Sequence, residues 1–377
     1  MKRFFALLLL CALALSVTAS ADGPELHAPS AVLMEKTTGT VLCARDEHTP
    51  REPASVTKIM TILLVMEAID SGALDYDDAV TASAHAASMG GSQIWLREGE
   101  QMTVHDLLKA VCVVSGNDAA VALGEHLAGS EAAFVERMNA RAAALGMADT
   151  HFVNATGLPA EGHVTSAYDI ALMSRELILR HPDVRQFTTV WTDSLRGGDS
   201  LLVNTNRLIR FYDGATGLKT GSTGAAGYCL SATAERNGME LIAVVLQGKS
   251  SDERFADARA LLDYGFASFA LVRVAPGAAL PPLPVRLGER SAVQPVLTPD
   301  NALLLEKSAA ADLRTEVILP TEIDAPVRAG EKLGELRVTR ADGGAAASLP
   351  ILAGESVARV TWGRLFLRIL RAALCAE

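Results

Sequence analysis

The order of predicted strands and helices constrains the fold of this chain more than any other feature. Apolar and β-branched residues that alternate loosely predict two strands within Ser30–Ala44, around Thr38-Gly39. Later in the chain, Asn237-Gly238 separates the apolar runs Gly227–Ala234 and Met239–Leu246, which is a strong hairpin signal. Helical patterns fill the middle. Strands at both ends of one domain predict an α+β fold, with an antiparallel sheet completed by those ends and helices packed against it.

Apolar periodicity also predicts where the helices lie. One helix opens near Ser55, where Pro53 precedes the apolar run Ile59–Met66. A second pattern begins at Thr103, breaks at Ser115-Gly116-Asn117 and then resumes. Further helical segments are predicted for Glu131–Leu145, Ser166–Leu179 and Arg254–Tyr264.

The composition changes near Val274, where clustered prolines indicate a linker or an edge. Short apolar runs follow, such as Thr315–Pro320 and Leu333–Val338, and turn signals separate them. We therefore expect a larger domain over residues 22–272 and a small all-β domain over residues 273–353.

The N-terminus predicts export. Residues 1–21 show the three parts of a secretory signal peptide: basic Lys2 and Arg3, an apolar stretch, and the small residues Ala19-Ser20-Ala21 before the cleavage point. The alternative is a retained membrane helix. The apolar stretch is short for a bilayer span, so we favour cleavage.

The C-terminus, residues 354–377, predicts an amphipathic helix. Arg364, Arg368 and Arg371 fall within an arc of about 60° on a helical wheel, and apolar side chains fill the other side. The segment is too short and too charged to span a bilayer. With Trp362 at one end, it fits a helix lying in the membrane interface. The alternative is a helix docked on its own protein.

Composition limits the partners that this chain can have. Its formal net charge is -10 with no dense basic patch in the main body, so nucleic acid is not an expected partner. Cys43, Cys112, Cys229 and Cys375 form no C-x-x-C pair, and the histidines include no H-E-x-x-H. These spacings do not suggest a metal site, and we expect the first three cysteines to be small buried hydrophobic residues.

Ser55 and Lys58 are three residues apart at a predicted helix start, so their side chains share one face and can meet. A cation is unfavourable at a helix N-terminus, and a capping box would place Glu or Gln three residues after the serine. The partial positive charge of the helix N-terminus therefore favours the neutral amine of Lys58 over the ammonium. A neutral amine can accept the proton of a serine nucleophile. The alternative is a serine near a helix start beside a solvated lysine.

Two further segments carry candidate residues. In Ser115-Gly116-Asn117 a hydroxyl and an amide could relay a proton and hold a substrate carbonyl, or Asn117 could simply cap the next helix. Lys219-Thr220-Gly221 precedes the first strand of the predicted hairpin. Its cation and hydroxyl could bind a substrate carboxylate, and Gly221 lets a chain or ligand approach the backbone. The alternative is a glycine-rich turn.

The motifs S-x-x-K, Ser-x-Asn and K-T-G occur in that order at Ser55, Ser115 and Lys219, as in penicillin-binding proteins and class A β-lactamases. The chain resembles the low-molecular-mass penicillin-binding D-alanyl-D-alanine carboxypeptidases, which are serine peptidases, over essentially its whole mature length. Gly116 stands where class A β-lactamases have Asp, which favours the carboxypeptidases. Other segments that look like this family are Gly91-Ser92-Gln93, Thr150–Asn154, Gly157-Leu158-Pro159 and Thr216–Gly221. The resemblance implies a β-lactamase/transpeptidase-like domain, an antiparallel sheet with helices, followed by the small all-β domain.

The resemblance also implies catalytic roles. Ser55 would attack the carbonyl between two D-alanines at the end of a peptidoglycan stem peptide, and Lys58 would take its proton. Ser115 would relay a proton toward the leaving D-alanine. Asn117 would orient the substrate amide.

By the same resemblance, the segment from Lys219 onward would bind substrate. Lys219 and Thr220 would hold the terminal carboxylate beside Gly221. The backbone amides of Ser55 and Ser222 would form the oxyanion hole, in which each donor contributes about 2.7–4 kcal/mol. No metal or cofactor is implied.

The implied partners are the stem peptide ending in D-Ala-D-Ala, β-lactams as covalent inhibitors, and a membrane surface reached through the C-terminal helix. The implied location is the outer face of the cytoplasmic membrane, facing the cell wall, after export. Several alternatives share the motifs. They are a peptidoglycan endopeptidase or transpeptidase, a β-lactamase, and a non-catalytic protein that binds the wall or senses β-lactams.

Overall fold

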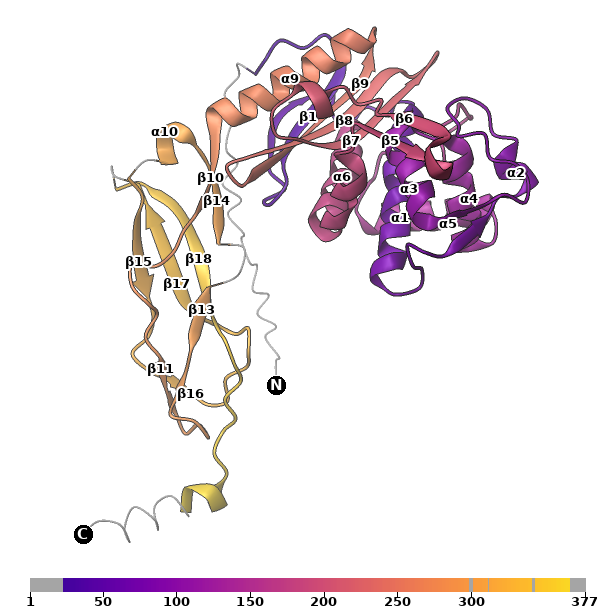
Figure 1. Ribbon diagram of the computed structural model, residues 1–377. Coiled ribbons are helices and arrows are strands. Elements are labelled where there is room, and N and C mark those ends of the chain that lie inside the picture. The colour runs from indigo at the N-terminus through magenta and orange to yellow at the C-terminus, as the bar shows by residue number, and fades with distance from the viewer. Residues whose placement is uncertain (1–22, 298–300, 311, 341–342, 367–377) are drawn as a thin grey trace, which may run out of the picture.

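The computed structural model describes residues 23–297, 301–310, 312–340 and 343–366. It consists of a mixed helix-and-sheet unit followed by a smaller unit made mostly of strands (Figure 1). The predicted signal peptide, residues 1–21, lies outside the described residues and stays a prediction.

A five-stranded antiparallel sheet, in the order β2-β1-β9-β8-β7, organises the larger unit. Strand β1 pairs with β9, with Ser30 opposite Leu246, so the two ends of this unit complete one sheet, as the sequence predicted. The Asn237-Gly238 hairpin is also present, between β8 and β9. The strands are β1 Ser30–Glu35, β2 Val41–Arg45, β7 Ala215–Thr223, β8 Gly227–Arg236 and β9 Met239–Gly248.

Both faces of this sheet are covered, because alternate residues of its central strands enter two separate cores. Ile242 and Val244 of β9 belong to a large core with the central helices, whereas Leu241 and Ala243 belong to a second core under the last helix of this unit. The central helices are α1 Lys58–Asp70, α3 Val104–Val113, α4 Asn117–Ala128, α5 Glu131–Ala144 and α6 Ala167–Arg180, and the last is α9 Ser251–Ser268. They correspond to the helical segments expected from the sequence, although α9 extends further at both ends than Arg254–Tyr264.

Short elements that the sequence did not predict complete the larger unit. They are β3 Ala79–Thr81 with β4 Gln101–Thr103, β5 Thr192–Leu195 with β6 Ser200–Val203, the 3-10 turns η1 Ala54–Thr57, η2 Pro182–Val184 and η3 Arg196–Gly198, and the one-turn helices α2 Ala84–Ala87, α7 Arg185–Thr188 and α8 Leu208–Phe211.

The helix predicted to open near Ser55 is present, and it begins as the 3-10 turn η1, which continues into α1 at Lys58. Lys219-Thr220-Gly221 precedes the hairpin strands β8 and β9, as predicted, and lies inside β7, the edge strand that pairs with β8. The alternative of a glycine-rich turn is wrong. The sequence Ala-Thr-Gly-Leu-Lys-Thr-Gly looked like a turn because of its glycines, yet main-chain pairing with β8 holds it extended.

The smaller unit is built from strands, apart from the four-residue helix α10 Lys307–Ala310. Strand β10 contains the predicted boundary at residues 272–273 and pairs with β14, so the two units join through a two-stranded sheet. The strands are β10 Phe269–Arg273, β11 Leu283–Arg286, β12 Ala292–Val293, β13 Pro295–Leu297, β14 Ala302–Glu306, β15 Arg314–Ile318, β16 Ile323–Asp324, β17 Lys332–Thr339 and β18 Ala345–Ala353.

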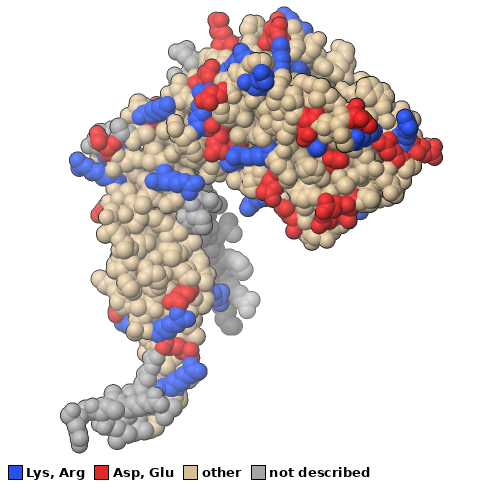
Figure 2. All heavy atoms as spheres, in the orientation of Figure 1, with Lys and Arg blue, Asp and Glu red and all other residues tan. Residues whose placement is uncertain are grey.

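The surface and the C-terminal residues bear on possible partners. On the face shown in Figure 2, basic and acidic side chains are interspersed over the larger unit. In the part of the chain that the structure describes, no helix is long and apolar enough to cross a membrane. Residues 362–366 are helical, and Trp362 is 87% exposed. Arg368 and Arg371 lie outside the described residues, so the amphipathic anchor stays a prediction.

Candidate active site

Ser55 and Lys58 meet in the structure. Lys58 Nζ lies 2.9 Å from Ser55 Oγ. The 3-10 turn η1 explains this contact, since three residues per turn bring the side chains at i and i+3 over one another. The alternative of a solvated lysine is wrong, because Lys58 is fully buried.

The surroundings of Lys58 suit a neutral amine. Its Nζ contacts Asn117 Oδ1 at 2.6 Å and the carbonyl oxygen of Thr156 at 2.8 Å, in addition to Ser55. A neutral amine has two N–H donors and one lone pair. It can therefore donate to Asn117 and Thr156 while its lone pair accepts the proton of Ser55.

The pKa of Lys58 is held well below that of an ordinary lysine. Burial is the main cause, the charge of Lys219 acts in the same direction, and Asp118 opposes both. From the sequence we expected the field of the helix N-terminus to lower it. Burial instead dominates, because desolvation penalises the ammonium form directly.

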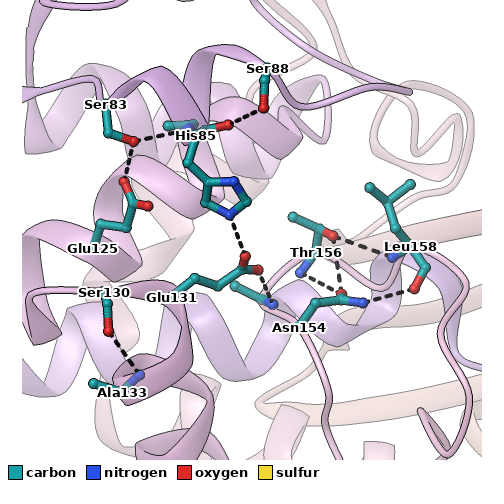
Figure 3. Close-up of polar contacts among 12 residues, drawn as sticks. Ser83, His85, Ser88, Glu125, Ser130, Glu131, Ala133, Asn154, Thr156 and Leu158 are labelled. Atoms are coloured by element: carbon teal, nitrogen blue, oxygen red, sulfur yellow. Dashed lines mark hydrogen bonds and ion pairs between the residues drawn. The ribbon is translucent and has the colours of Figure 1, made fainter.

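The loop Asn154–Leu158 holds the carbonyl that contacts Lys58 (Figure 3). Asn154 Oδ1 accepts hydrogen bonds from Thr156 N, Thr156 Oγ1 and Gly157 N, and Asn154 Nδ2 donates to the Leu158 carbonyl. Such an Asx turn fixes the backbone locally. We predicted no role for Asn154 or Thr156 from the sequence, although an Asn three residues before a Gly is a turn signal that could have pointed to them.

The loop is also anchored from outside. Glu131 Oε1 accepts from Ala155 N at 2.9 Å, and Glu131 Oε2 contacts His85 Nε2 at 2.8 Å (Figure 3). Gly157, at φ +81°, packs so tightly that a Cβ there would lie 1.8 Å from the Ala54 carbonyl oxygen. The loop Asn154–Leu158 therefore packs directly against η1.

His163 links η1 to Val153 through hydrogen bonds. Its Nδ1 accepts from Val153 N at 3.0 Å, so Nε2 carries the proton and donates to Thr57 Oγ1 at 2.8 Å. Burial lowers the pKa of His163 to about 4. The ring is therefore neutral at physiological pH and acts here as a hydrogen-bonding link between Val153 and Thr57.

Ser115 and Asn117 lie in the turn between α3 and α4. Ser115 adopts φ +64°, and its Oγ is buried with no hydrogen-bond partner among the described residues. Asn117 Nδ2 donates to the Gly90 carbonyl at 2.6 Å while its Oδ1 faces Lys58. The alternative that Asn117 caps α4 is wrong, since the capping position is Gly116 and no side chain caps it.

Strand β7 brings its residues against η1. A Cβ on Gly221 would lie 2.9 Å from both Pro53 O and Ser55 N, so the close approach expected at this glycine is made by the chain itself. Lys219 is 1% exposed and donates to the Thr220 carbonyl at 2.9 Å. Burial lowers the pKa of Lys219 to about 7, and the charge of Arg254 adds to this effect.

The remaining binding candidates continue along the same strand. Thr220 Oγ1 lies 2.7 Å from Thr205 Oγ1, and Ser222 is exposed beside a cavity of about 500 Å³. Arg254, which we did not predict to lie at the site, donates to the carbonyls of Gly221 in β7 and Cys229 in β8 and so joins α9 to both strands. A single arginine inside a helical pattern gave no signal of this contact.

The structure thus joins Ser55, Lys58 and Asn117 by direct contacts, places Gly221 against Ser55, and couples Lys58 to Lys219 electrostatically. Within the described ranges, no three His, Cys, Asp or Glu side chains are grouped so that they could hold a metal ion. Cys112 and Cys229 are buried free thiols and Cys43 is half-buried.

A serine in contact with a buried lysine, beside an antiparallel sheet flanked by helices, is an arrangement typical of serine acyl-transfer enzymes. A family model described as D-alanyl-D-alanine carboxypeptidase matches residues 16–250, and one described as penicillin-binding protein 5, C-terminal domain, matches residues 274–359. The chain belongs to the D-alanyl-D-alanine carboxypeptidase family. The resemblance and the fold class inferred from the sequence are confirmed.

Individual relatives agree with this family. The D-alanyl-D-alanine carboxypeptidase DacF of Bacillus subtilis is 41% identical over 371 residues, which cover 95% of each chain. The solved structure of penicillin-binding protein 5 from Haemophilus influenzae has a TM-score of 0.79 at 29% identity and covers 90% of this chain and 100% of that one. Penicillin-binding protein 6B of Escherichia coli has a TM-score of 0.73 at 33% identity, with coverages of 89% and 98%.

Proposed function

We propose that this enzyme removes the terminal D-alanine from peptidoglycan stem pentapeptides through an acyl-enzyme on Ser55. The observation that carries the proposal is the contact of 2.9 Å between Lys58 Nζ and Ser55 Oγ, made by a buried lysine whose other two contacts are both acceptors. Lys58 in this setting is a base ready to receive the serine proton.

The reaction then follows from the placement of each group. Ser55 Oγ forms a bond to the carbonyl carbon between the two D-alanines as its proton passes to Lys58. The C–N bond breaks, and the leaving amine takes the proton that Lys58 received, through Ser115, whose buried hydroxyl has no hydrogen-bond partner among the described residues. Lys58 is then neutral again. Water next attacks the ester, which releases the shortened peptide and restores Ser55. The proton relay through Ser115 is supported by its hydroxyl, which donates a hydrogen bond to no other described residue.

Residues of β7 and α4 bind the substrate. Lys219 and Thr220 hold the terminal carboxylate, and Asn117 orients the substrate amide next to Lys58. The backbone N–H groups of Ser55 and Ser222 stabilise the oxyanion, where each donor is worth about 2.7–4 kcal/mol. The packing of Gly221 on Ser55 N supports this arrangement, since it brings β7 and η1 together.

β-Lactams would acylate the same serine, since they present a carbonyl in the place of the dipeptide. Among solved relatives, penicillin-binding protein D2 of Listeria monocytogenes is described in its ampicillin-bound form, at 35% identity over 64% of this chain. We also propose that residues 1–21 direct export and that residues 22–272 carry catalysis. Residues 354–377 would place the enzyme at the outer face of the cytoplasmic membrane, and residues 273–353 form the intervening β domain.

The test is release of D-alanine from a synthetic stem pentapeptide. The wild-type chain should release one D-alanine per peptide, and Ser55→Ala should release none. A wild-type protein that instead joins the peptide to an added amine, without net release to water, would identify a transpeptidase. Rapid turnover of penicillin would identify a β-lactamase.

A further inference from the structure

Trp95 is a large apolar side chain that the fold places in solvent. It is 74% exposed, whereas its neighbours Ile94 and Leu96 are buried. Its backbone adopts φ +56°, a conformation that a bulky residue adopts only when its surroundings enforce it. Backbone outliers of this kind concentrate at ligand-binding and catalytic sites.

Asp118 enforces this conformation. Its carboxylate is fully buried and accepts from Ile94 N at 3.0 Å and from Leu96 N at 3.0 Å. The residues on both sides of Trp95 are thus fixed, and the indole between them is directed outward.

The same segment borders the active site. Asn117 N donates to the Ser92 carbonyl at 2.7 Å, and Asn117 Nδ2 donates to the Gly90 carbonyl. Asn117 and Asp118 are consecutive residues of α4, so one helix start holds both the catalytic lysine and the segment that carries Trp95.

A cavity of about 630 Å³ lies beside Trp95, between this segment and the β5–β6 hairpin. Its size falls in the range of small-ligand sites, about 300–1,000 Å³. Arg97, Glu98, Glu100 and Arg196 line it, so two cations face two anions and the lining carries no formal net charge.

Hydrogen bonds hold Arg196 in place beside the cavity. Its Nε pairs with Glu100 Oε1 at 2.8 Å, and Nη1 donates to the Ile94 carbonyl and to Ser200 Oγ. Its Nη2 is buried and has no hydrogen-bond partner among the described residues. An exposed aromatic face beside a lining of balanced charge suits an uncharged ligand rich in hydroxyl and amide groups.

We propose that Trp95 and this cavity bind the sugar rings of the glycan strand to which the stem peptide is attached. The proposal rests on the proposed function, because that function supplies a peptide borne on a glycan. An anionic lipid surface fits less well, since the lining has no excess positive charge.

The test compares the same pentapeptide free and attached to a short oligosaccharide of the glycan strand. The wild-type enzyme should show a kcat/KM about tenfold higher for the glycan-borne peptide, mainly through KM. Trp95→Ala should remove this preference and leave the free pentapeptide unchanged. Trp362→Ala, which removes another exposed indole, is the matched control and should keep the preference.

A second measurement separates the two proposals. Calorimetry with peptide-free glycan oligosaccharides should show binding by the wild type and by Trp362→Ala, and about tenfold weaker binding by Trp95→Ala. If no peptide loses D-alanine, the proposed function fails, and the calorimetry still decides this inference. Equal preference in wild type and Trp95→Ala, or a Trp95→Ala defect only in binding to lipid vesicles, would overturn it.

Discussion

Gly221→Ala should slow acylation of Ser55 because a methyl group there has no room. The new Cβ would lie 2.9 Å from Pro53 O, 2.9 Å from Ser55 N and 3.0 Å from Val56 N, whereas ordinary contacts begin near 3.4 Å. All three atoms belong to the backbone, so η1 and β7 must separate by at least about 0.5 Å. Such overpacking costs about 1–3 kcal/mol, and a misplacement of about 1 Å can cost about 100-fold in rate.

We therefore expect the second-order rate of acylation by a fluorescent penicillin to fall about 10- to 100-fold. The melting temperature should fall by about 2–4 °C for each kcal/mol lost. Gly224→Ala is the matched control, since a Cβ three residues further on meets no heavy atom within 4 Å and should leave both values unchanged. Wild-type acylation by Gly221→Ala, or an equal loss in Gly224→Ala, would refute the account of how β7 positions Ser55.

Three further predictions concern Lys219, Asn154 and Ser115. The pKa of Lys219 near 7 predicts that KM for the pentapeptide rises as the pH increases through about 7, because the cation that holds the carboxylate is lost; Lys219→Arg should flatten this rise. Because the pKa of Lys219 is lowered to about 7 in the folded protein, burial of the charged lysine reduces the free energy of unfolding below this pH, and the reduction shrinks as the pH rises above it. In a series of denaturation curves at different pH, Lys219→Met should not show this rise in the free energy of unfolding. Asn154→Ala should reduce acylation about 10- to 100-fold by loosening the carbonyl that contacts the lysine base, and Asn154→Asp, which keeps the acceptor, should restore part of it. Ser115→Gly should raise the free energy of unfolding, measured in urea, by about 1 kcal/mol, because glycine tolerates the left-handed backbone at this position and the buried hydroxyl without a partner is removed. The same variant should release D-alanine more slowly. Unchanged release would remove Ser115 from the mechanism.

Local chemistry along the chain was enough to predict the strands β1, β2, β8 and β9 of the sheet beside the site, whereas β7, which carries Lys219, was not predicted. The Asn237-Gly238 turn and the alternating residues of Ser30–Ala44 act over a few residues, so their strands could be read directly. The pairing of β1 with β9 followed from the order of elements, since both ends of the unit carried strands around a helical middle.

The catalytic pair was also predictable, but the reason for the state of its lysine was not. Spacing alone brought Ser55 and Lys58 to one face. The burial that lowers the pKa of Lys58 comes from packing against residues about 60 and 100 positions away, Asn117 and Thr156, and no local pattern reports it.

The residues missed by sequence reasoning act through their backbone or at long range. Thr156 contributes a carbonyl, which any residue type could supply, and Arg254 of α9 binds the Gly221 carbonyl of β7. Gly221 was recognised as a site of close approach, yet only the structure identifies η1 as the segment that approaches.

The most direct test of the central claim is to map the adduct formed with a labelled penicillin. Peptide mass spectrometry of the acylated wild-type chain should place the label on Ser55 alone, and Ser55→Ala should remain unlabelled although it is folded. A label on any other residue, or a labelled Ser55→Ala protein, would contradict the assignment of Ser55 as the nucleophile that Lys58 activates.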